Sequence, residues 1–166
     1  PEYIFSFEGE VKYAWMKEYY PAQYEEMKKF IESGRWHISG ASWDATDTLV
    51  PSIESALRNI MLGQDYYRKE FGVESTDIFL PDCFGFGWTL PAIASHCGLI
   101  GFSSQKLQWR NKPFYGNDKY PFTVGLWQGI DGSTIMMTHG YDYNQRFEDG
   151  DLSENKDLLE LTGHSP

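Results

Sequence analysis

One acidic side chain stands where a short apolar segment ends, near the middle of the chain. The residues Asp77–Leu80 are apolar enough for a buried strand, and Pro81 and then Asp82 follow at once. In α/β proteins ligands meet the loops at the carboxyl ends of strands, so this position suits a catalytic carboxylate or a metal ligand. A nearby helix start would keep Asp82 ionised. On spacing alone, Asp82 also fits a turn that caps the helix expected near Thr89.

A second strand end carries polar and aromatic residues. Arg35–Ser39 alternates as a half-buried strand does, and the polar stretch Ala41–Leu49 follows it. This stretch contains Trp43 and Asp47. Chemistry is therefore expected at the ends of two strands.

Helices separate these strands along the chain. Strands are expected at residues 2–6, Arg35–Gly40, Asp77–Leu80, Leu99–Ser103, Thr123–Gln128 and Thr134–Thr138, and helices at Glu10–Tyr19, Pro21–Gly34, Ser52–Gly72 and Leu90–Cys97. Ser52 is expected to cap the longest helix. The buried faces are expected to be Val11, Ala14 and Trp15 in the first helix, and Ile53, Leu57, Ile60, Met61 and Tyr67 in the longest one. Alternating helices and nearly all-apolar strands predict an α/β fold, with a parallel sheet covered on both faces.

The remaining segments are less regular. The loop Gln108–Pro121 is too long for a simple connector, and Gly129–Ser133 predicts a hairpin turn. From Arg146 onward the chain is acidic and weakly patterned. The chain starts at Pro1 inside an expected strand, so we expect it to come from a longer protein.

The composition limits the classes of function. The 166 residues suffice for one domain, and 41% hydrophobic with 23% charged residues is ordinary for a soluble globular protein. A net charge of −10 argues against a phosphate-binding surface, and so against nucleic acid as a partner. The aromatic content of 17% indicates either a site for sugar rings or a tightly packed aromatic core. No apolar run approaches the length of a membrane span. Cys83 and Cys97 lack a partner motif, which fits reduced thiols in a cytosolic protein.

Two blocks of residues share the order and the separation of a known pattern. The first is Leu80-Pro81-Asp82-Cys83-Phe84-Gly85, Leu90-Pro91, Gly98, Phe102, Gln105-Lys106, Trp109 and Gly129-Ile130-Asp131-Gly132-Ser133. The upstream block is Gly34-Arg35-Trp36, Gly40, Trp43, Asp47, Pro51-Ser52, Glu54-Ser55, Arg58 and Gly63-Gln64. Between about Tyr3 and His139 the chain thereby resembles the alpha-mannosidases of glycoside hydrolase family 38.

This resemblance implies a role for Asp82 and for the residues around it. Asp82 matches the catalytic nucleophile of a retaining reaction on alpha-linked mannose, and the same aspartate ligates zinc. Lys106 matches a basic residue that keeps the nucleophile charged, although a solvated lysine is the alternative. The candidates for sugar-facing rings are Trp43, Phe84 and Trp88, with Trp109 a weaker one. Asp47 is expected at the rim of the pocket or in a structural role. The fold implied is part of a (β/α) barrel of the glycoside hydrolase/deacetylase type.

The departures from the family pattern concern the metal and the acid. The family's His-x-Asp zinc motif occurs nowhere in this chain, and residues 1–6 resemble the strand after it. The last histidine ligand and the acid/base aspartate normally lie beyond the matched segment. The chain's own histidines, His37, His96, His139 and His164, do not match those positions, although His139 ends a strand and is a candidate to approach the site. The 166 residues are therefore expected to lack the first strand and the C-terminal part of the catalytic domain, and to be inactive alone.

Two other interpretations remain open from the sequence. One is a non-catalytic carbohydrate-binding or interaction module of the same fold. The other is a relative in the same superfamily of glycosidases and deacetylases with a different substrate, against which the Gly34-Arg35-Trp36 block argues. For the enzyme, mannose-containing oligosaccharides are the expected partner and the cytoplasm the expected location. Missing strands would leave sheet edges free, so homo-oligomers are expected too.

Overall fold

The computed structural model describes residues 3–106 and 124–139. In chain order the elements are β1 (Phe5–Phe7), α1 (Glu10–Tyr19), α2 (Pro21–Glu32), β2 (Trp36–Ile38), α3 (Ile53–Phe71), β3 (Asp77–Phe79), α4 (Leu90–His96), β4 (Gly101–Ser104), β5 (Val124–Gln128) and β6 (Thr134–His139). The expected loop 108–121 with Trp109, and the tail from Arg146 with His164, lie outside the described residues.

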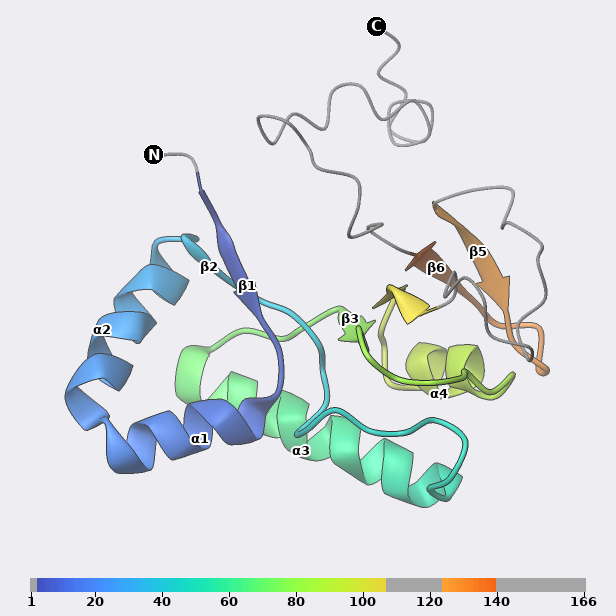
Figure 1. The fold of residues 1–166 in the computed structure, drawn as a ribbon, viewed down its shortest axis with the longest axis horizontal. Helices are drawn as coiled ribbons and strands as arrows, with labels where there is room; N and C mark the ends of the chain where they lie inside the picture. Colours follow the sequence, from blue (N-terminus) through green and yellow to red (C-terminus); the bar gives the residue numbers. More distant parts are fainter. Residues whose placement is uncertain (1–2, 107–123, 140–166) are drawn as a thin grey trace, which may run out of the picture.

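The described strands form two mostly parallel sheets flanked by helices (Figure 1). In the first, β1 and β2 are parallel. In the second, β3, β4 and β6 are parallel in that order, and β5 joins β6 antiparallel. The sheets meet where the N–H of Ala41, after β2, donates to the carbonyl of Asp77 in β3 at 2.9 Å. The predicted α/β fold is confirmed, but the strands of the described residues do not close into a barrel.

Two clusters of buried side chains make up the core. The larger one gathers aliphatic residues of α3, α4 and the four-stranded sheet around Ile78, Leu80 and Phe102. The smaller one is rich in aromatic residues and lies among α1, α2, α3 and β2. Three of its members are the tyrosines Tyr13, Tyr24 and Tyr67, each at most 2% exposed. Part of the aromatic surplus therefore serves core packing.

The ends of α3 follow the sequence prediction closely. The Ser52 hydroxyl accepts a hydrogen bond from the N–H of Ser55 at 3.2 Å, so the predicted N-cap is confirmed. At the other end Gly72 adopts a left-handed φ of 68°, a conformation that glycine takes without strain. Both boundaries are thus set by local chemistry.

The predicted buried faces of two helices are partly wrong. In α1, Trp15 is 53% exposed, whereas Glu10 and Tyr13 are buried. In α3, Met61 and Ile53 are exposed.

The reason in α3 is a close approach at Gly63. A Cβ atom on Gly63 would lie 2.4 Å from the Ala41 carbonyl oxygen, so only glycine permits this contact. The contact turns Gly63, Gln64 and Tyr67 inward and leaves Met61 outside.

The β5–β6 hairpin carries exposed apolar side chains. Leu126 and Met136 pair across these strands, and they are 73% and 54% exposed. β5 pairs antiparallel with β6, as the predicted hairpin implies, and antiparallel strands tolerate one solvated face. The Gly129–Ser133 turn itself forms as predicted, with the Gly129 N–H donating to the Ser133 carbonyl at 2.8 Å.

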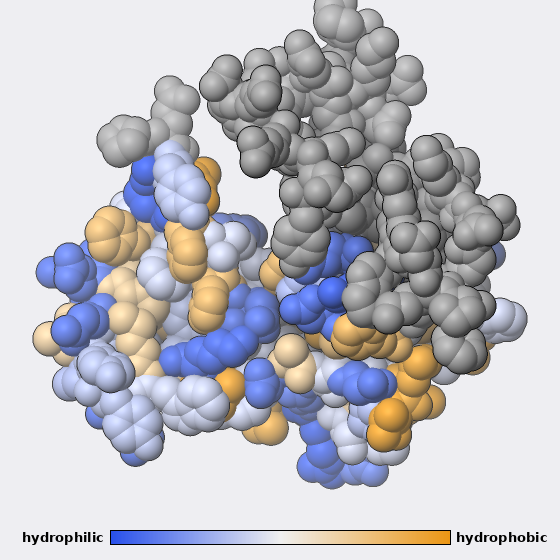
Figure 2. Space-filling model, in the orientation of Figure 1, coloured by the Kyte–Doolittle hydropathy of each residue, from blue (hydrophilic) through white to orange (hydrophobic). Residues whose placement is uncertain are grey.

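The surface mixes polar and apolar residues (Figure 2). Exposed apolar side chains include Leu49 and Val50, in the loop before α3, and Trp88, in the loop before α4. None of the described helices has the length and apolar character needed to cross a bilayer.

Candidate active site

Asp82 lies just past the carboxyl end of β3. Leu80 still belongs to the sheet, since its N–H donates to the Ser103 carbonyl at 3.0 Å and its side chain is buried. The chain then leaves the sheet, and the Asp82 side chain is 76% exposed. A carboxylate is therefore presented to solvent at the end of a buried strand.

Lys106 reaches Asp82 from the neighbouring strand. Because β3 and β4 are parallel, their carboxyl ends lie side by side, and Lys106 follows shortly after β4. Its ammonium Nζ lies 2.9 Å from Oδ1 of Asp82, and the lysine side chain is only 14% exposed. Lys106 is thus a partner of Asp82 and not a solvated surface lysine. The ammonium, with a smaller contribution from Gln105, holds the pKa of the Asp82 carboxyl below its ordinary value.

Asp82 does not cap the following helix, so that alternative is wrong. Helix α4 begins at Leu90, and its N-cap is Thr89 and not Asp82. The carboxyl of Asp82 is turned instead toward Lys106. Its ionisation therefore depends on a lysine that follows the next strand rather than on a helix start.

Two of the expected sugar-facing rings lie in the same loop as Asp82. Phe84 is 54% exposed, and the Lys106 ammonium lies 5.3 Å from the centre of its ring. Trp88 is 77% exposed, so its ring lies at the surface. Exposed rings beside a carboxylate can pack against the C–H face of a sugar, which is an amphipathic ligand.

The other two expected substrate residues make structural contacts. The Trp43 ring packs edge-on against Tyr66 of α3, with the ring centres 5.7 Å apart. Asp47 accepts hydrogen bonds at Oδ1 from the backbone N–H groups of Leu49 and Val50, at 2.7 and 3.1 Å. Asp47 therefore shapes its own loop, which agrees with the structural role considered for it.

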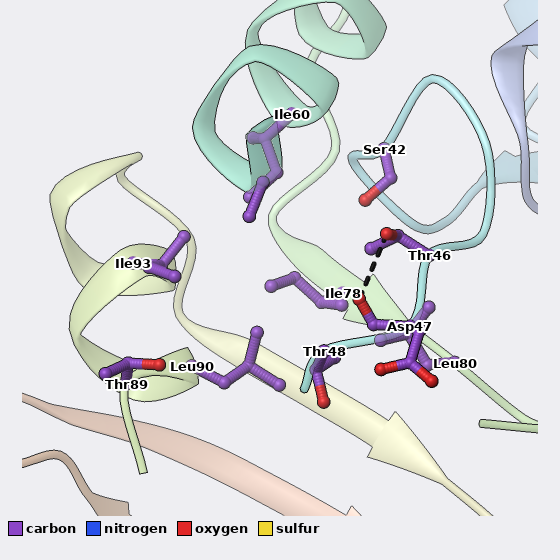
Figure 3. A pocket seen from close by; sticks show the side chains of 11 residues that line it. Ser42, Thr46, Asp47, Thr48, Ile60, Ile78, Leu80, Thr89, Leu90 and Ile93 are labelled. Atoms are coloured by element: carbon purple, nitrogen blue, oxygen red, sulfur yellow. Dashed lines mark hydrogen bonds between the residues drawn. The ribbon is translucent and has the colours of Figure 1, made fainter. Parts of the chain in front are cut away.

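A small cavity lies beneath these loops (Figure 3). It is lined by side chains from the loop before α3, from α3, β3 and α4, namely Ser42, Thr46, Asp47, Thr48, Ala56, Ile60, Ile78, Leu80, Thr89, Leu90 and Ile93. The space for a water-sized molecule inside is about 20 Å³. That is room for roughly one water, whereas ligand pockets measure about 300–1,000 Å³. The cavity is therefore too small to hold a sugar ring.

The sequence as a whole matches a known enzyme family. The profile described as glycosyl hydrolases family 38 N-terminal domain matches residues 1–162. The chain belongs to this family.

Relatives that are named alpha-mannosidases are several times longer than the chain. Alpha-mannosidase G of Dictyostelium discoideum is 36% identical over an aligned length of 165 residues, and the match covers 95% of this chain and 15% of that protein. Alpha-mannosidase 2C1 of Homo sapiens is 32% identical over 137 residues, which are 82% of this chain and 13% of that protein. The chain thus spans about 15% of the length of such relatives.

Solved structures support the fold. An alpha-mannosidase from Enterococcus faecalis V583 superposes with a TM-score of 0.69 at 21% identity, over 84% of this chain and 15% of that one. A 4-alpha-glucanotransferase from Thermococcus litoralis gives a TM-score of 0.64 at 18% identity, over 81% of this chain and 20% of that one. These two names stand for different reactions, so the fold alone does not select a substrate.

The resemblance to family 38 implies a zinc ion, so the side chains at this site can be compared with the ligands that zinc needs. Carboxylate oxygens are competent zinc ligands, and Asp82 presents one at an exposed position. In residues 3–106 and 124–139, no three or more His, Cys, Asp or Glu side chains are grouped to hold a metal ion. His96 lies 3.6 Å from Asp131 instead, and the side chain of His139 lies outside what is described. Asp82 therefore fits as one ligand of a set that needs further residues.

Glu10 is a buried acid that the sequence reasoning missed. It is 0% exposed, and neither carboxyl oxygen has a hydrogen-bond partner among the described residues. Burial raises the pKa of Glu10 to about 8, and the charges of Glu8 and Asp44 add to this rise. The backbone N–H of Glu10 and the Tyr67 hydroxyl lie near the carboxyl and act in the opposite direction, although neither makes a hydrogen bond of good geometry with it. An acid in the first turn of a helix is ordinarily a solvated charge, so its residue type and position gave no signal of burial.

Proposed function

We propose that this chain is part of the catalytic domain of a retaining alpha-mannosidase, with Asp82 as its nucleophile. The observation that supports this most directly is the exposed, ionised Asp82 beside Lys106, in a family 38 chain whose relatives are named alpha-mannosidases. The proposed substrates are oligosaccharides that end in alpha-linked mannose.

In the proposed reaction, a carboxylate oxygen of Asp82 bonds to the anomeric carbon of mannose as the bond from that carbon to the leaving oxygen breaks. The leaving oxygen takes a proton from a second carboxylic acid. Water, deprotonated by that same second group, then opens the glycosyl-enzyme and releases Asp82 as a carboxylate. In retaining enzymes the two carboxyl groups lie about 5–5.5 Å apart. The family resemblance assigns the second one to a later part of the parent protein, and we include that assignment in the proposal.

The neighbours of Asp82 have separate parts in this proposal. Lys106 keeps the carboxylate ionised before attack, because its ammonium favours the charged form. Phe84 and Trp88 pack against the sugar. Trp43 and Asp47 act indirectly, by fixing the loop after β2.

The parent protein is proposed to supply what the described residues lack. Zinc, when bound with Asp82 as one ligand, would orient mannose hydroxyls beside the nucleophile. Further strands would extend the two sheets toward a (β/α) barrel, and the 166 residues would be inactive alone. The cytoplasmic location and homo-oligomers predicted from the sequence belong to the same proposal, and cell fractionation and sizing chromatography would test them.

Hydrolysis of an aryl alpha-mannoside by the full-length protein tests the nucleophile. Asp82→Asn keeps the shape but removes the charge and the nucleophilic oxygen, so we expect kcat/KM to fall at least about a thousandfold. The matched control is Asp65→Asn, at an exposed aspartate of α3 that pairs with Lys69, and it should keep full activity. Brisk turnover by Asp82→Asn would overturn the assignment.

Zinc and sugar binding by the full-length protein separate an enzyme from a non-catalytic binding module. Stoichiometric zinc, together with loss of turnover in Asp82→Asn, supports the enzyme. Mannoside binding without any hydrolysis by the unmodified protein would support a binding module, with the exposed rings of Phe84 and Trp88 as its surface.

A further inference from the structure

The loop that carries Asp82 has little support from its own strand. β3 is only three residues long, and Asp82 follows after it has ended. The loop continues through Gly85, whose φ of 111° is open to glycine but to few other residues. Neither feature fixes the loop in place, so its position has to depend on contacts with other segments.

Two hydrogen bonds join this loop to the loop after β2. The Cys83 thiol donates to the carbonyl of Thr46 at 3.1 Å, and the Thr48 hydroxyl donates to the carbonyl of Gly85 at 2.8 Å. These hydrogen bonds hold Cys83, directly after Asp82, and Gly85. The backbone of the Asp82 loop is therefore attached on both sides of Phe84.

The loop that supplies these contacts is itself fixed. Asp47 accepts two backbone hydrogen bonds from Leu49 and Val50, and the Thr46 hydroxyl donates to the Asp47 carbonyl at 3.1 Å. Figure 3 shows Thr46, Asp47 and Thr48 along one segment at the edge of the small cavity. The segment 46–48 is therefore held by hydrogen bonds within its own loop, and its bonds to Cys83 and Gly85 can fix the position of the Asp82 loop.

We propose that Thr48 is a positioning residue, whose hydrogen bond to the Gly85 carbonyl holds the Asp82 loop where the carboxylate can attack. Of the two contacts, that of Thr48 is shorter, and its donor is a hydroxyl, which donates more strongly than a thiol. The role in attack rests on the proposed function, whereas the attachment of the loop does not. Thr48 itself touches no reacting atom.

The two cysteines give a test of the attachment that is independent of catalysis. Both are free and half-buried, but Cys83 lies in the Asp82 loop and Cys97 at the end of α4. In the 166-residue chain, alkylation by iodoacetamide followed by peptide mass spectrometry gives a rate for each thiol. Global unfolding would accelerate both reactions together, so the ratio of the Cys83 rate to the Cys97 rate reports on the loop alone.

Three substitutions distinguish the hydroxyl from the space it fills. Thr48→Val removes the hydroxyl at nearly constant volume, and we expect the ratio to rise about three- to tenfold, which corresponds to the loss of one ordinary hydrogen bond. Thr48→Ser restores the hydroxyl and should restore the ratio. Thr89→Val is the control, because Thr89 lines the same cavity but its side chain makes no capping hydrogen bond to α4. This variant should leave the ratio of the two alkylation rates unchanged. A wild-type ratio in Thr48→Val would overturn the proposal.

Kinetics of the full-length protein test the positioning. A displaced nucleophile should lower kcat about tenfold or more with little change in KM, because small misplacements slow the chemical step. Thr48→Ser should recover most of kcat. If the protein hydrolyses no mannoside, the proposed function fails while the thiol ratio still decides the attachment. If the ratio rises in Thr48→Val but kcat does not fall, the positioning role is wrong.

Discussion

Asp82 and Glu10 are two carboxylic acids that the fold treats in opposite ways. Asp82 is 76% exposed, with an ammonium 2.9 Å away, and its pKa lies below the ordinary value. Glu10 is 0% exposed without a hydrogen-bond partner among the described residues, and its pKa is raised to about 8. The comparison shows that a charged partner keeps one acid ionised, whereas burial keeps the other neutral at pH 7.

The difference in exposure and ionisation decides which of the two acids can react. An ionised and accessible carboxylate can act as a nucleophile. A neutral and enclosed one cannot, and it makes the stability of the fold depend on pH. Both acids lie in loops or helix starts next to short strands, so their position along the chain does not distinguish them.

The strongest test of this contrast replaces Glu10 by a glutamine, which cannot ionise. Its folded pKa of about 8 exceeds the ordinary 4.5, so the folded state keeps a proton that the unfolded chain has lost. The free energy of unfolding should therefore fall as pH rises from about 4.5 to 8, and level off above that. The fall from this group amounts to at most about 5 kcal/mol. Glu10→Gln should remove the slope, measured by urea unfolding at a series of pH values.

Glu54→Gln is the matched control for that experiment. Glu54 also lies in the first turn of a helix, α3, but it is 73% exposed and pairs with Arg58 at 2.7 Å. Its replacement should leave the pH profile of unfolding as in the unmodified chain. An unchanged slope in Glu10→Gln would show that Glu10 is ionised in the folded state.

A second test places a methyl group into the close approach beside Glu10. A Cβ on Gly63 would lie 2.4 Å from the Ala41 carbonyl oxygen and 2.8 Å from Cδ of Glu10. Gly63→Ala should therefore lower the free energy of unfolding by about 3 kcal/mol, despite the better helix propensity of alanine. Gly101→Ala is the control, because its nearest contact would be an ordinary 3.5 Å. Equal stability of these two variants would contradict the packing described for α3.

The smallest expected effect concerns the other acid. Lys106→Gln removes the ammonium beside Asp82, so the pKa of that carboxyl should rise toward its ordinary value. The carboxyl carbon-13 shift of Asp82, followed against pH, measures it. Lys69→Gln removes an exposed lysine that pairs with Asp65, and it should leave Asp82 unaffected. A pKa unchanged by Lys106→Gln would mean that another group holds Asp82 ionised.

The sequence allowed the elements and the exposed acid to be predicted. Pro21, Ser52 and Gly72 mark helix ends by local chemistry that requires no knowledge of the fold, and these boundaries agree with the structure to within a residue or two. The end of β3 was likewise visible, because an apolar run stopped at Pro81. Local signals of this kind predict element boundaries because they do not depend on contacts with distant residues.

The inward faces of α1 and α3 could not be predicted for a physical reason. Hydrophobic patterning selects large apolar residues such as Trp15 and Met61, but the structure buries Glu10 and Gly63 in their place. That choice depends on how closely the loop 41–43 approaches α3, which is a long-range contact. The partnership of Lys106 with Asp82 followed from the family resemblance, whereas the attachment through Thr48 left no pattern in the sequence.

Asp77 has a consequence for how the protein can vary. Its carboxylate accepts hydrogen bonds from the Gly40 N–H at 3.1 Å, from the Ser39 hydroxyl at 2.9 Å and from the Ser75 hydroxyl at 2.8 Å. One side chain at the start of β3 thereby sets the spacing between the two sheets. Residues further along both loops can then be exchanged during evolution, to suit a different ligand, without a change in the distance between the strands that carry them.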